Sequence, residues 1–321
     1  MSAYAEHGEL RPCFGCRPYC WRVLGEVTVL VNPHAGRGRS RRIAGAAIAE
    51  LRRLRVGVDV VVTRSAAHAR DEAARVVADG PDAVVVCGGD GAVSGVLPVL
   101  AGGSTPLGLL PGGSGNDFAR ALGLPVRDPV AAARVVALGA AERVDLGRVG
   151  DRWFGTVVAA GFDARVNERM NAMTWPRGRL RYHAALVGEL AAFRPLPFVL
   201  EVDGRRRELE AMLVAVGNTA SYGGGMRICP GARVDDGLLD VTIVTRIGRT
   251  KLVRLFPSVY PGTHVRRPEV LTLRGRSVRL AAASVVAYAD GERVGPLPVS
   301  CSVVPGALAV LGFGGAVTGS R

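Results

Sequence analysis

Two glycine-rich segments hold the residues that could do phosphate chemistry. The first, CGGDGAVSG at 87–95, follows the apolar run 83–86 and has Asp90 as its only charge. The second, PGGSGND, spans 111–117. Successive main-chain N–H groups in a glycine turn form a concave anion site, and a following helix adds its dipole. Asp90 could hold Mg²⁺ or water beside bound phosphates. Each loop alone could be a turn with a helix cap, but together they favour a phosphate site.

The elements that would position these loops alternate between strands and helices. Apolar runs predict strands at 27–31, 58–63, 83–87 and 107–110, and the segments between them predict helices ending near 54, at 66–78, near 92–100, from 116 and near 129–138. This order predicts a doubly wound parallel sheet covered on both faces. Ligands bind beyond the carboxyl ends of such strands. The segment NPHAGRG at 32–38 and both glycine segments lie at those ends.

The second half of the chain has a different texture. Short alternating segments between 143 and 275, separated by Gly, Asp and Pro, predict antiparallel strands of a β-sandwich, with one helix near 178–193. We therefore expect an α/β nucleotide-binding domain at 26–143, which the segment 302–321 could complete, and a mostly antiparallel β-sandwich domain at 144–301 that binds the substrate.

The first 25 residues lack hydrophobic periodicity, and we expect a disordered tail at 1–25. Cys13, Cys16 and Cys20 form C-x2-C-x3-C there, and a metal knuckle completed by His7 is the alternative. The six cysteines of the chain have no paired spacing otherwise, which favours a reducing, cytoplasmic setting.

The charge of the chain points to an anionic partner. The net charge is +13, almost all of it from arginine, because Lys251 is the only lysine. A Walker A loop needs a lysine after its glycines, so that motif is excluded. Residues 246–279 contain nine basic side chains against the single acid Glu269, with apolar residues between them. This pattern favours contact with an anionic membrane surface; the alternative is a solvated face, and no motif specific to nucleic acid accompanies it.

No segment predicts a transmembrane helix or a signal peptide. The longest uncharged run, 295–320, contains too many glycines and prolines to span a bilayer as a helix. We therefore expect peripheral association with the inner face of the membrane. The sequence leaves a homodimer open.

The motifs resemble those of a known family. VNPHAGRG, CGGDGAVSG and LGLLPGGSGNDFARALGLP are similar to the three signature stretches of the diacylglycerol kinase catalytic family, which includes bacterial lipid kinases and sphingosine kinases. The resemblance continues through 217–241, 261–270 and 289–294. It implies an ATP-binding α/β domain and transfer of the ATP γ-phosphate to a lipid hydroxyl, with conversion of diacylglycerol to phosphatidic acid as the first expectation.

The resemblance also implies roles for individual residues. It places a structural Mg²⁺ at Asp236, helped by the main-chain carbonyls of Arg233 and Leu238, where the pattern alone would predict an Asp-Gly hairpin turn. It makes Glu292 of the D-G-E motif the general base, and Asp90 is the other catalytic candidate. The expected nucleotide contacts are Asn32, Thr63, Gly88, Gly89, Asp90, Gly91, Ala92, Val93, Ser94, Gly113, Ser114, Asn116 and Asp117.

One motif departs from the family pattern. Where the family has G-G-D-G-T-x-N-E, this chain has Ala92, Ser94 and Gly95 in place of Thr, Asn and Glu. A hydroxyl, an amide and a carboxylate are thereby lost at the nucleotide edge, so we expect weakened or altered nucleotide use. Two alternatives stay open: an NAD kinase, which shares the GGDG loop, and a catalytically silent lipid or nucleotide binder.

Overall fold

The computed structural model describes residues 24–162, 168–169, 173, 175 and 194–314. The helix expected near 178–193 and the cysteines of the N-terminal tail lie outside the described residues. At the start of the described chain, Leu24 donates a backbone hydrogen bond to Ala137 and Gly25 donates one to the carboxylate of Asp82. These two residues therefore join the folded part of the molecule.

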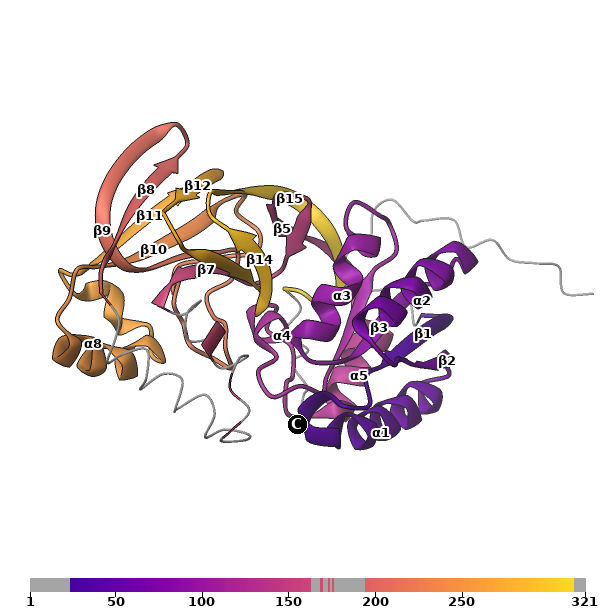
Figure 1. Ribbon diagram of the computed structural model, residues 1–321. Helices are drawn as coiled ribbons and strands as arrows, with labels where there is room; N and C mark the ends of the chain where they lie inside the picture. Colours follow the sequence, from indigo (N-terminus) through magenta and orange to yellow (C-terminus); the bar gives the residue numbers. More distant parts are fainter. Residues whose placement is uncertain (1–23, 163–167, 170–172, 174, 176–193, 315–321) are drawn as a thin grey trace, which may run out of the picture.

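The N-terminal half is built on four parallel strands (Figure 1). Their order in the sheet is β4-β3-β1-β2, and every pairing between them is parallel. The carboxyl ends of all four therefore lie at one edge. The strands are β1 (Glu26–Val31), β2 (Gly57–Val62), β3 (Ala83–Gly88) and β4 (Leu107–Pro111).

Helices bury both faces of this sheet. Val27, Val29 and Val31 of β1 pack with α1 and α5 on one face, whereas Leu30 packs with α2 and α3 on the other. Burial on both faces explains why the strands are nearly continuous apolar runs. The helices are α1 (Arg39–Arg53), α2 (Ala66–Asp79), α3 (Asp90–Leu100) and α5 (Pro129–Leu138), with the short η1 (Ala35–Gly38) and α4 (Asp117–Ala121) between them.

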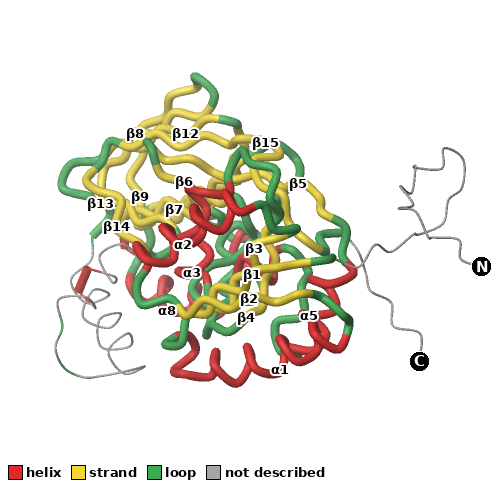
Figure 2. Tube along the Cα trace, turned by 90° about the vertical axis from the view of Figure 1, so that its right-hand side faces the viewer, coloured by secondary structure: helices red, strands yellow, loops and turns green. Residues whose placement is uncertain are grey.

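The C-terminal half is mostly antiparallel. Its extended strands lie to one side of the helices of the N-terminal half in Figure 1, whereas the two halves overlap in the view of Figure 2, which is turned by 90°. The strands are β5 (Ala141–Val149), β6 (Arg152–Phe154), β7 (Val157–Gly161), β8 (Leu196–Val202), β9 (Arg205–Gly217), β10 (Leu239–Thr245), β11 (Val270–Gly275), β12 (Ser277–Ala281), β13 (Val286–Ala289), β14 (Glu292–Pro296) and β15 (Val299–Leu311). This is the β-sandwich expected from the sequence, so the predicted fold class is confirmed.

The strand β15 joins the two halves. Its first residues pair with β12, most of its length pairs with β5, and its end reaches β4 through a parallel pairing of Val310 with Leu107. The register against β5 shifts between Val304 and Leu308, where Pro305 and Gly306 interrupt the strand. Such a bulge bends a strand, which lets one strand pair with strands of both halves. The end of β15 thus pairs with the parallel strands of the N-terminal half.

Three short helices cover one side of the second half. They are α8 (Arg249–Leu255), η2 (Phe256–Val259) and η3 (Thr263–Arg266), and they pack on an apolar cluster that includes Met212, Ile228 and Val244. Within the part of the chain that the structure describes, no helix has both the length and the apolar character needed to cross a membrane.

Candidate active site

The three loops after β1, β3 and β4 touch one another through glycine backbone. A Cβ atom on Gly113 would lie 2.4 Å from the Cα of Gly89, and a Cβ on Gly36 would lie 2.2 Å from the carbonyl oxygen of Gly112. No side chain fits at such distances. Glycine is therefore needed at these positions because the loop backbones touch. The sequence alone does not reveal this reason.

Asn116 fixes the loop after β4. Its backbone has a φ of 57°, in the left-handed region. Its side-chain oxygen accepts a hydrogen bond from the Gly113 N–H at 2.8 Å, and its amide donates to the Gly113 carbonyl at 3.1 Å. The asparagine thus closes the loop on itself and does not cap α4.

The first turn of α3 is the part of these loops that suits an anion. Gly89 is the N-cap and accepts the first intrahelical hydrogen bonds, from Ala92 and Val93. The N–H groups of Asp90 and Gly91 precede those bonds and have no acceptor within the helix. Gly91 is exposed, and a Cβ there would meet open space. This turn therefore presents N–H groups that an anion could accept as hydrogen-bond donors, and its role as a phosphate loop stays a prediction.

Asp90 is half-buried beside this turn. Its Oδ1 accepts a hydrogen bond from the Phe118 N–H at 3.0 Å, which ties the loop after β3 to α4. Burial raises the pKa of Asp90, and the negative charge of Asp117 raises it further. The ionised carboxylate is thus disfavoured at this position, and a bound cation or protonation would stabilise the group.

Asp117 joins the two halves of the molecule. Only 2% of the residue is exposed. Its Oδ1 accepts hydrogen bonds from the Ser221 hydroxyl at 3.0 Å and the Gly225 N–H at 2.8 Å, and its Oδ2 accepts one from the Gly224 N–H at 2.6 Å. The expected nucleotide contact is therefore occupied by the glycine-rich segment 221–226, which we call the clamp loop.

The D-G-E motif lies at the same edge. The turn between β13 and β14 has left-handed backbone at Asp290 (φ 50°) and Gly291 (φ 82°). The Asp290 carboxylate accepts hydrogen bonds from the N–H groups of Gly155 and Thr156, both at 2.8 Å, and from the Thr156 hydroxyl at 2.5 Å. Burial raises the pKa of Asp290, and the charge of Asp90 contributes. The two motifs are linked through Gly155 and Phe118: a Cβ on Gly155 would lie 3.0 Å from the Phe118 ring, and the Phe118 N–H donates to Asp90.

Glu292, the predicted base, is the exposed first residue of β14. Its neighbour Asp290 holds the turn that presents it, a role that sequence reasoning missed because Asp290 looks like an ordinary turn aspartate. Asn218 was missed as well. It is fully buried and donates to the carbonyls of Asp145 and Gly155, and among the described residues its Oδ1 has no hydrogen-bond partner.

The remaining predicted nucleotide contacts surround the loops. Asn32 donates from its N–H to the Cys87 carbonyl, and its side chain accepts from the His34 N–H. Thr63 is buried and hydrogen-bonded to the Val31 carbonyl, whereas Ser114 is exposed. Gly88 is buried, and a Cβ there would lie 2.6 Å from the Cβ of Ala92.

The residues of the departing motif lie on the first turns of α3. Val93 is buried in the core, Ala92 packs on the edge of that core, and Ser94 is half-buried. Gly95 faces α2: a Cβ there would lie 3.7 Å from the Ala66 carbonyl oxygen. A glutamate at 95 would therefore have to extend past the start of α2.

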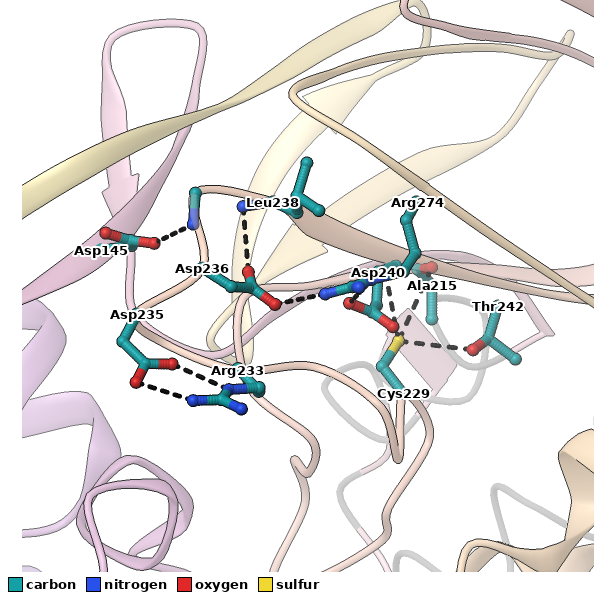
Figure 3. A network of polar contacts seen from close by, with 11 residues as sticks. Asp145, Ala215, Cys229, Arg233, Asp235, Asp236, Leu238, Asp240, Thr242 and Arg274 are labelled. Atoms are coloured by element: carbon teal, nitrogen blue, oxygen red, sulfur yellow. Dashed lines mark hydrogen bonds and ion pairs between the residues drawn. The ribbon is translucent and has the colours of Figure 1, made fainter. Parts of the chain in front are cut away.

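The predicted metal position is shown in Figure 3. The Asp236 Oδ1 accepts a hydrogen bond from the Leu238 N–H at 3.1 Å, and its Oδ2 pairs with Arg274. Arg274 also bonds Asp240 at 3.1 Å, while the side chain of Arg233 pairs with Asp235. Within the described residues, no group of three or more His, Cys, Asp or Glu side chains could hold a metal ion.

Asp145 organises the loop that carries Asp236. It is buried, and its two carboxylate oxygens accept hydrogen bonds from the N–H groups of Gly237 at 2.7 Å and Gly306 at 2.8 Å. Its own N–H donates to the Val234 carbonyl. Asp145 therefore connects this loop to the bend in β15, although its sequence context is only that of an alternating strand.

An apolar cavity of about 290 Å³ lies on the far side of the clamp loop. Tyr222 and Met226, at the two ends of the three glycines, both line it, and their backbones exchange hydrogen bonds. The rest of the wall is hydrophobic. It comes from β9, β10, α8 and η2, together with Phe162 after β7 and Ile228 after the clamp loop: Phe162, Met212, Leu213, Ile228, Val244, Leu252, Val253, Leu255, Phe256, Pro257 and Val259. One short loop thus touches both Asp117 and the cavity.

An α/β domain with a phosphate-type loop edge, joined to a β-sandwich that holds an apolar cavity, defines the class of this protein. Residues 26–149 match the family described as diacylglycerol kinase catalytic domain, and residues 156–312 match the YegS C-terminal NAD kinase beta sandwich-like domain. A diacylglycerol kinase of Mycobacterium tuberculosis is 49% identical over 294 residues, which cover 90% of this chain and 95% of that protein.

More distant proteins agree with this match. A diacylglycerol kinase of Bacillus subtilis is 27% identical over 277 residues, covering 84% of this chain and 90% of the relative. A crystal structure of a diacylglycerol kinase from Bacillus anthracis superposes with a TM-score of 0.70 at 21% identity, covering 92% of this chain and 99% of that one. The chain therefore belongs to the diacylglycerol kinase family, and it is a kinase.

Proposed function

We propose that the protein is an ATP- and Mg²⁺-dependent lipid kinase that transfers the ATP γ-phosphate to the hydroxyl of diacylglycerol, giving phosphatidic acid. The name of the 49% identical relative supports the substrate class. The observation that carries the proposal is the clamp loop: its glycine N–H groups bind Asp117 beside Asp90, and its two ends line the apolar cavity. An acyl chain in that cavity would bring its glycerol hydroxyl toward the phosphate loops.

The phosphate loops suit a triphosphate. The free N–H groups at the start of α3 would bind phosphate oxygens, and Asn32, Thr63, Gly113 and Ser114 would border the nucleotide. Catalysis of phosphoryl transfer is mostly positioning and charge stabilisation, so a rigid set of loops in mutual backbone contact is suited to it.

The residues at the predicted metal position fit Mg²⁺ in part. Asp236 offers one carboxylate, and the carbonyls of Arg233 and Leu238 would complete a hard oxygen set. Arg274 would then be held by Asp240 alone, to which its Nε already bonds. Mg²⁺ bound there would be structural and would hold the loop that carries Asp236. Mg²⁺ bound with the ATP phosphates would supply charge stabilisation at the transferring phosphoryl group. Asp90, whose pKa is raised by burial, is the carboxylate nearest the phosphate loop and would also favour a cation.

Glu292 would accept the proton of the lipid hydroxyl. A hydroxyl is a poor nucleophile near neutral pH, and a carboxylate within hydrogen-bond reach contributes about 10²- to 10⁴-fold to such a step. The hydrogen bonds of Asp290 to Gly155 and Thr156 hold the turn on which Glu292 lies. Asp290 is accordingly a positioning residue in this proposal.

The lipid would come from an anionic membrane surface at the cytoplasmic face. Val253 of α8 and Tyr260 are about half exposed, and Leu252, Val253 and Phe256 line the cavity. Arg246, Lys251 and Arg274 are paired with carboxylates, so less of the basic segment is available to lipid than its sequence suggests. Three other basic residues around the same helices are exposed and can attract anionic headgroups: Arg254, Arg266 and Arg267.

Transfer of radioactive phosphate from ATP to a panel of acceptors tests the proposal. Diacylglycerol in mixed micelles should be labelled in the presence of Mg²⁺ and not with excess EDTA. The panel includes NAD⁺ because the second domain also matches an NAD kinase-like sandwich, together with ceramide and sphingosine. Labelling of NAD⁺ alone would contradict the proposal and would indicate that the protein is an NAD kinase. Labelling of no acceptor, with ATP still bound, would indicate a silent binder.

A further inference from the structure

A second cavity, of about 520 Å³, lies at the seam between the two halves. Its walls come from α4, the clamp loop and the segment 232–235, and include Arg120, Arg227 and Arg233. This volume falls within the range of small-molecule sites. None of the predicted nucleotide contacts, and no residue of the apolar cavity, is among the described residues that line it. It is therefore distinct from the predicted nucleotide contacts and from the apolar cavity, although Arg233, whose carbonyl is a predicted metal ligand, lies in its wall.

The charge in this cavity is positive. Asp235 is the single acid in its wall, and it pairs with Arg233 at 3.0 Å. Arg120 donates from Nε to the Gly115 carbonyl at 3.1 Å, and Arg227 donates from one Nη to the Pro230 carbonyl at 3.4 Å. Within the described structure, the other guanidinium nitrogens of Arg120 and Arg227 have no protein acceptor. Two positive charges with free planar donors remain, which match the charge of a phosphate monoester near pH 7.

The lining also contains apolar residues. Ala121, Ala220, Val234 and Phe313 contribute them, and Val234 is buried. A ligand that satisfies both the basic and the apolar residues carries a phosphate and a carbon skeleton. We propose that this cavity is a regulatory site for a phosphate monoester, supplied either by a lipid headgroup or by a small soluble phosphate.

The walls of the cavity connect directly to the phosphate loops. Ser221 and Gly225 line it and also donate hydrogen bonds to Asp117. The next residue, Phe118, donates its N–H to Asp90. Arg120 holds the carbonyl of Gly115 in the loop after β4. A ligand that orders Arg120 and the clamp loop therefore acts on both glycine segments at once, and the reported range for such coupling is about 5- to 150-fold in affinity.

Direct binding tests the site without reference to catalysis. The probes are inorganic phosphate and soluble dihexanoyl phosphatidic acid, titrated at constant ionic strength and followed by ³¹P NMR and calorimetry. Because phosphate also fits the loop at α3, the informative quantity is the difference between wild type and Arg227→Gln. We expect Arg227→Gln to weaken binding at this site about tenfold or more. Arg205→Gln, an exposed arginine on the far hairpin, is the matched control and should bind like wild type.

For a second variant we expect tighter phosphate binding. Asp235→Asn frees Arg233 and should tighten phosphate binding, an outcome that misfolding would not produce. Tighter binding of the lipid than of inorganic phosphate identifies a lipid headgroup as the source, and equal or stronger binding of inorganic phosphate identifies a soluble one. Identical titrations for wild type, Arg227→Gln and Asp235→Asn would overturn the proposal.

The regulatory consequence rests on the proposed function and is measured separately. Under the kinase assay, the ligand should change the apparent KM for ATP at least about fivefold in wild type and in Arg205→Gln, but not in Arg227→Gln. Absence of any kinase activity would sink the proposed function while leaving the binding result intact. Binding that distinguishes the variants without any change in KM would remove the regulatory part.

Discussion

Asp117 provides a sharp test of how the site is assembled, because sequence and structure assign it different roles. The resemblance makes it a nucleotide contact, whereas the structure shows a buried carboxylate that accepts three hydrogen bonds from the clamp loop. The substitution Asp117→Asn keeps the shape of the side chain and one acceptor oxygen. It places an amide N–H₂ against the N–H of Gly224 or of Gly225.

The expected cost can be worked from these contacts. Whichever way the amide is turned, at least one buried backbone N–H loses its acceptor, which costs about 1–3 kcal/mol. The remaining bonds become neutral and weaken by up to about half. A total of about 2–4 kcal/mol corresponds to a fall in Tm of about 3–6 °C for a molecule of this size.

Calorimetric melting of wild type, Asp117→Asn and Asp151→Asn measures this effect. Asp151 is fully exposed, so its variant makes the same chemical change without the buried contacts and should melt like wild type. A Tm of Asp117→Asn within about 1 °C of wild type, combined with a raised KM for ATP, would refute the clamp and favour the nucleotide role.

Three further predictions concern the nucleotide edge, pH and the membrane. Ala92→Thr combined with Ser94→Asn should lower the KM for ATP, since it restores a hydroxyl and an amide on the first turns of α3; a loss of activity would mean that the edge is adapted to its own residues. His264 is fully buried, and burial lowers its pKa. Below about pH 6.5 the imidazole of His264 is therefore protonated in the unfolded chain but stays neutral in the folded chain, so the free energy of unfolding should fall by up to about 1.4 kcal/mol per pH unit in acid. Urea unfolding of His264→Gln should show a weaker dependence of this free energy on pH. An unchanged dependence would mean that other groups cause it. Vesicle sedimentation should require anionic lipid and weaken with salt, and Arg254→Gln should lower binding about fivefold; equal binding to neutral vesicles at high salt would contradict the electrostatic argument.

The fold was predictable because its signals are local. The runs at 27–31, 83–87 and 107–110 are almost entirely apolar, and 58–63 is the partly exposed edge run that contains Asp59. The observed parallel strands match all four runs to within about one residue. β15 was harder to predict as one strand, because Pro305 and Gly306 lie within it and its two ends pair with strands of different halves. The register shift that lets it do so depends on partners distant in sequence.

The sequence motifs of the site could be predicted, whereas the contacts between distant residues that assemble it could not. The glycine segments could be placed at the strand ends, yet the contact between Gly89 and Gly113 requires knowing that β3 and β4 are neighbours. The partners of Asp117 and Asp290 lie more than 100 positions away. Such pairs have no local signature, so each aspartate resembles an ordinary cap or turn until the chain is folded.

The central claim is that the D-G-E turn and the glycine loops form one phosphoryl-transfer site, and Glu292→Gln tests it most directly. Single-turnover transfer from radioactive ATP to diacylglycerol is compared for wild type, Glu292→Gln and Glu208→Gln, the last an exposed glutamate on β9 that serves as control. The account predicts a loss of about 10²- to 10⁴-fold for Glu292→Gln alone, with ATP affinity by calorimetry near wild type. A loss of less than about tenfold would contradict the assignment of Glu292 as the base and would direct attention to Asp90.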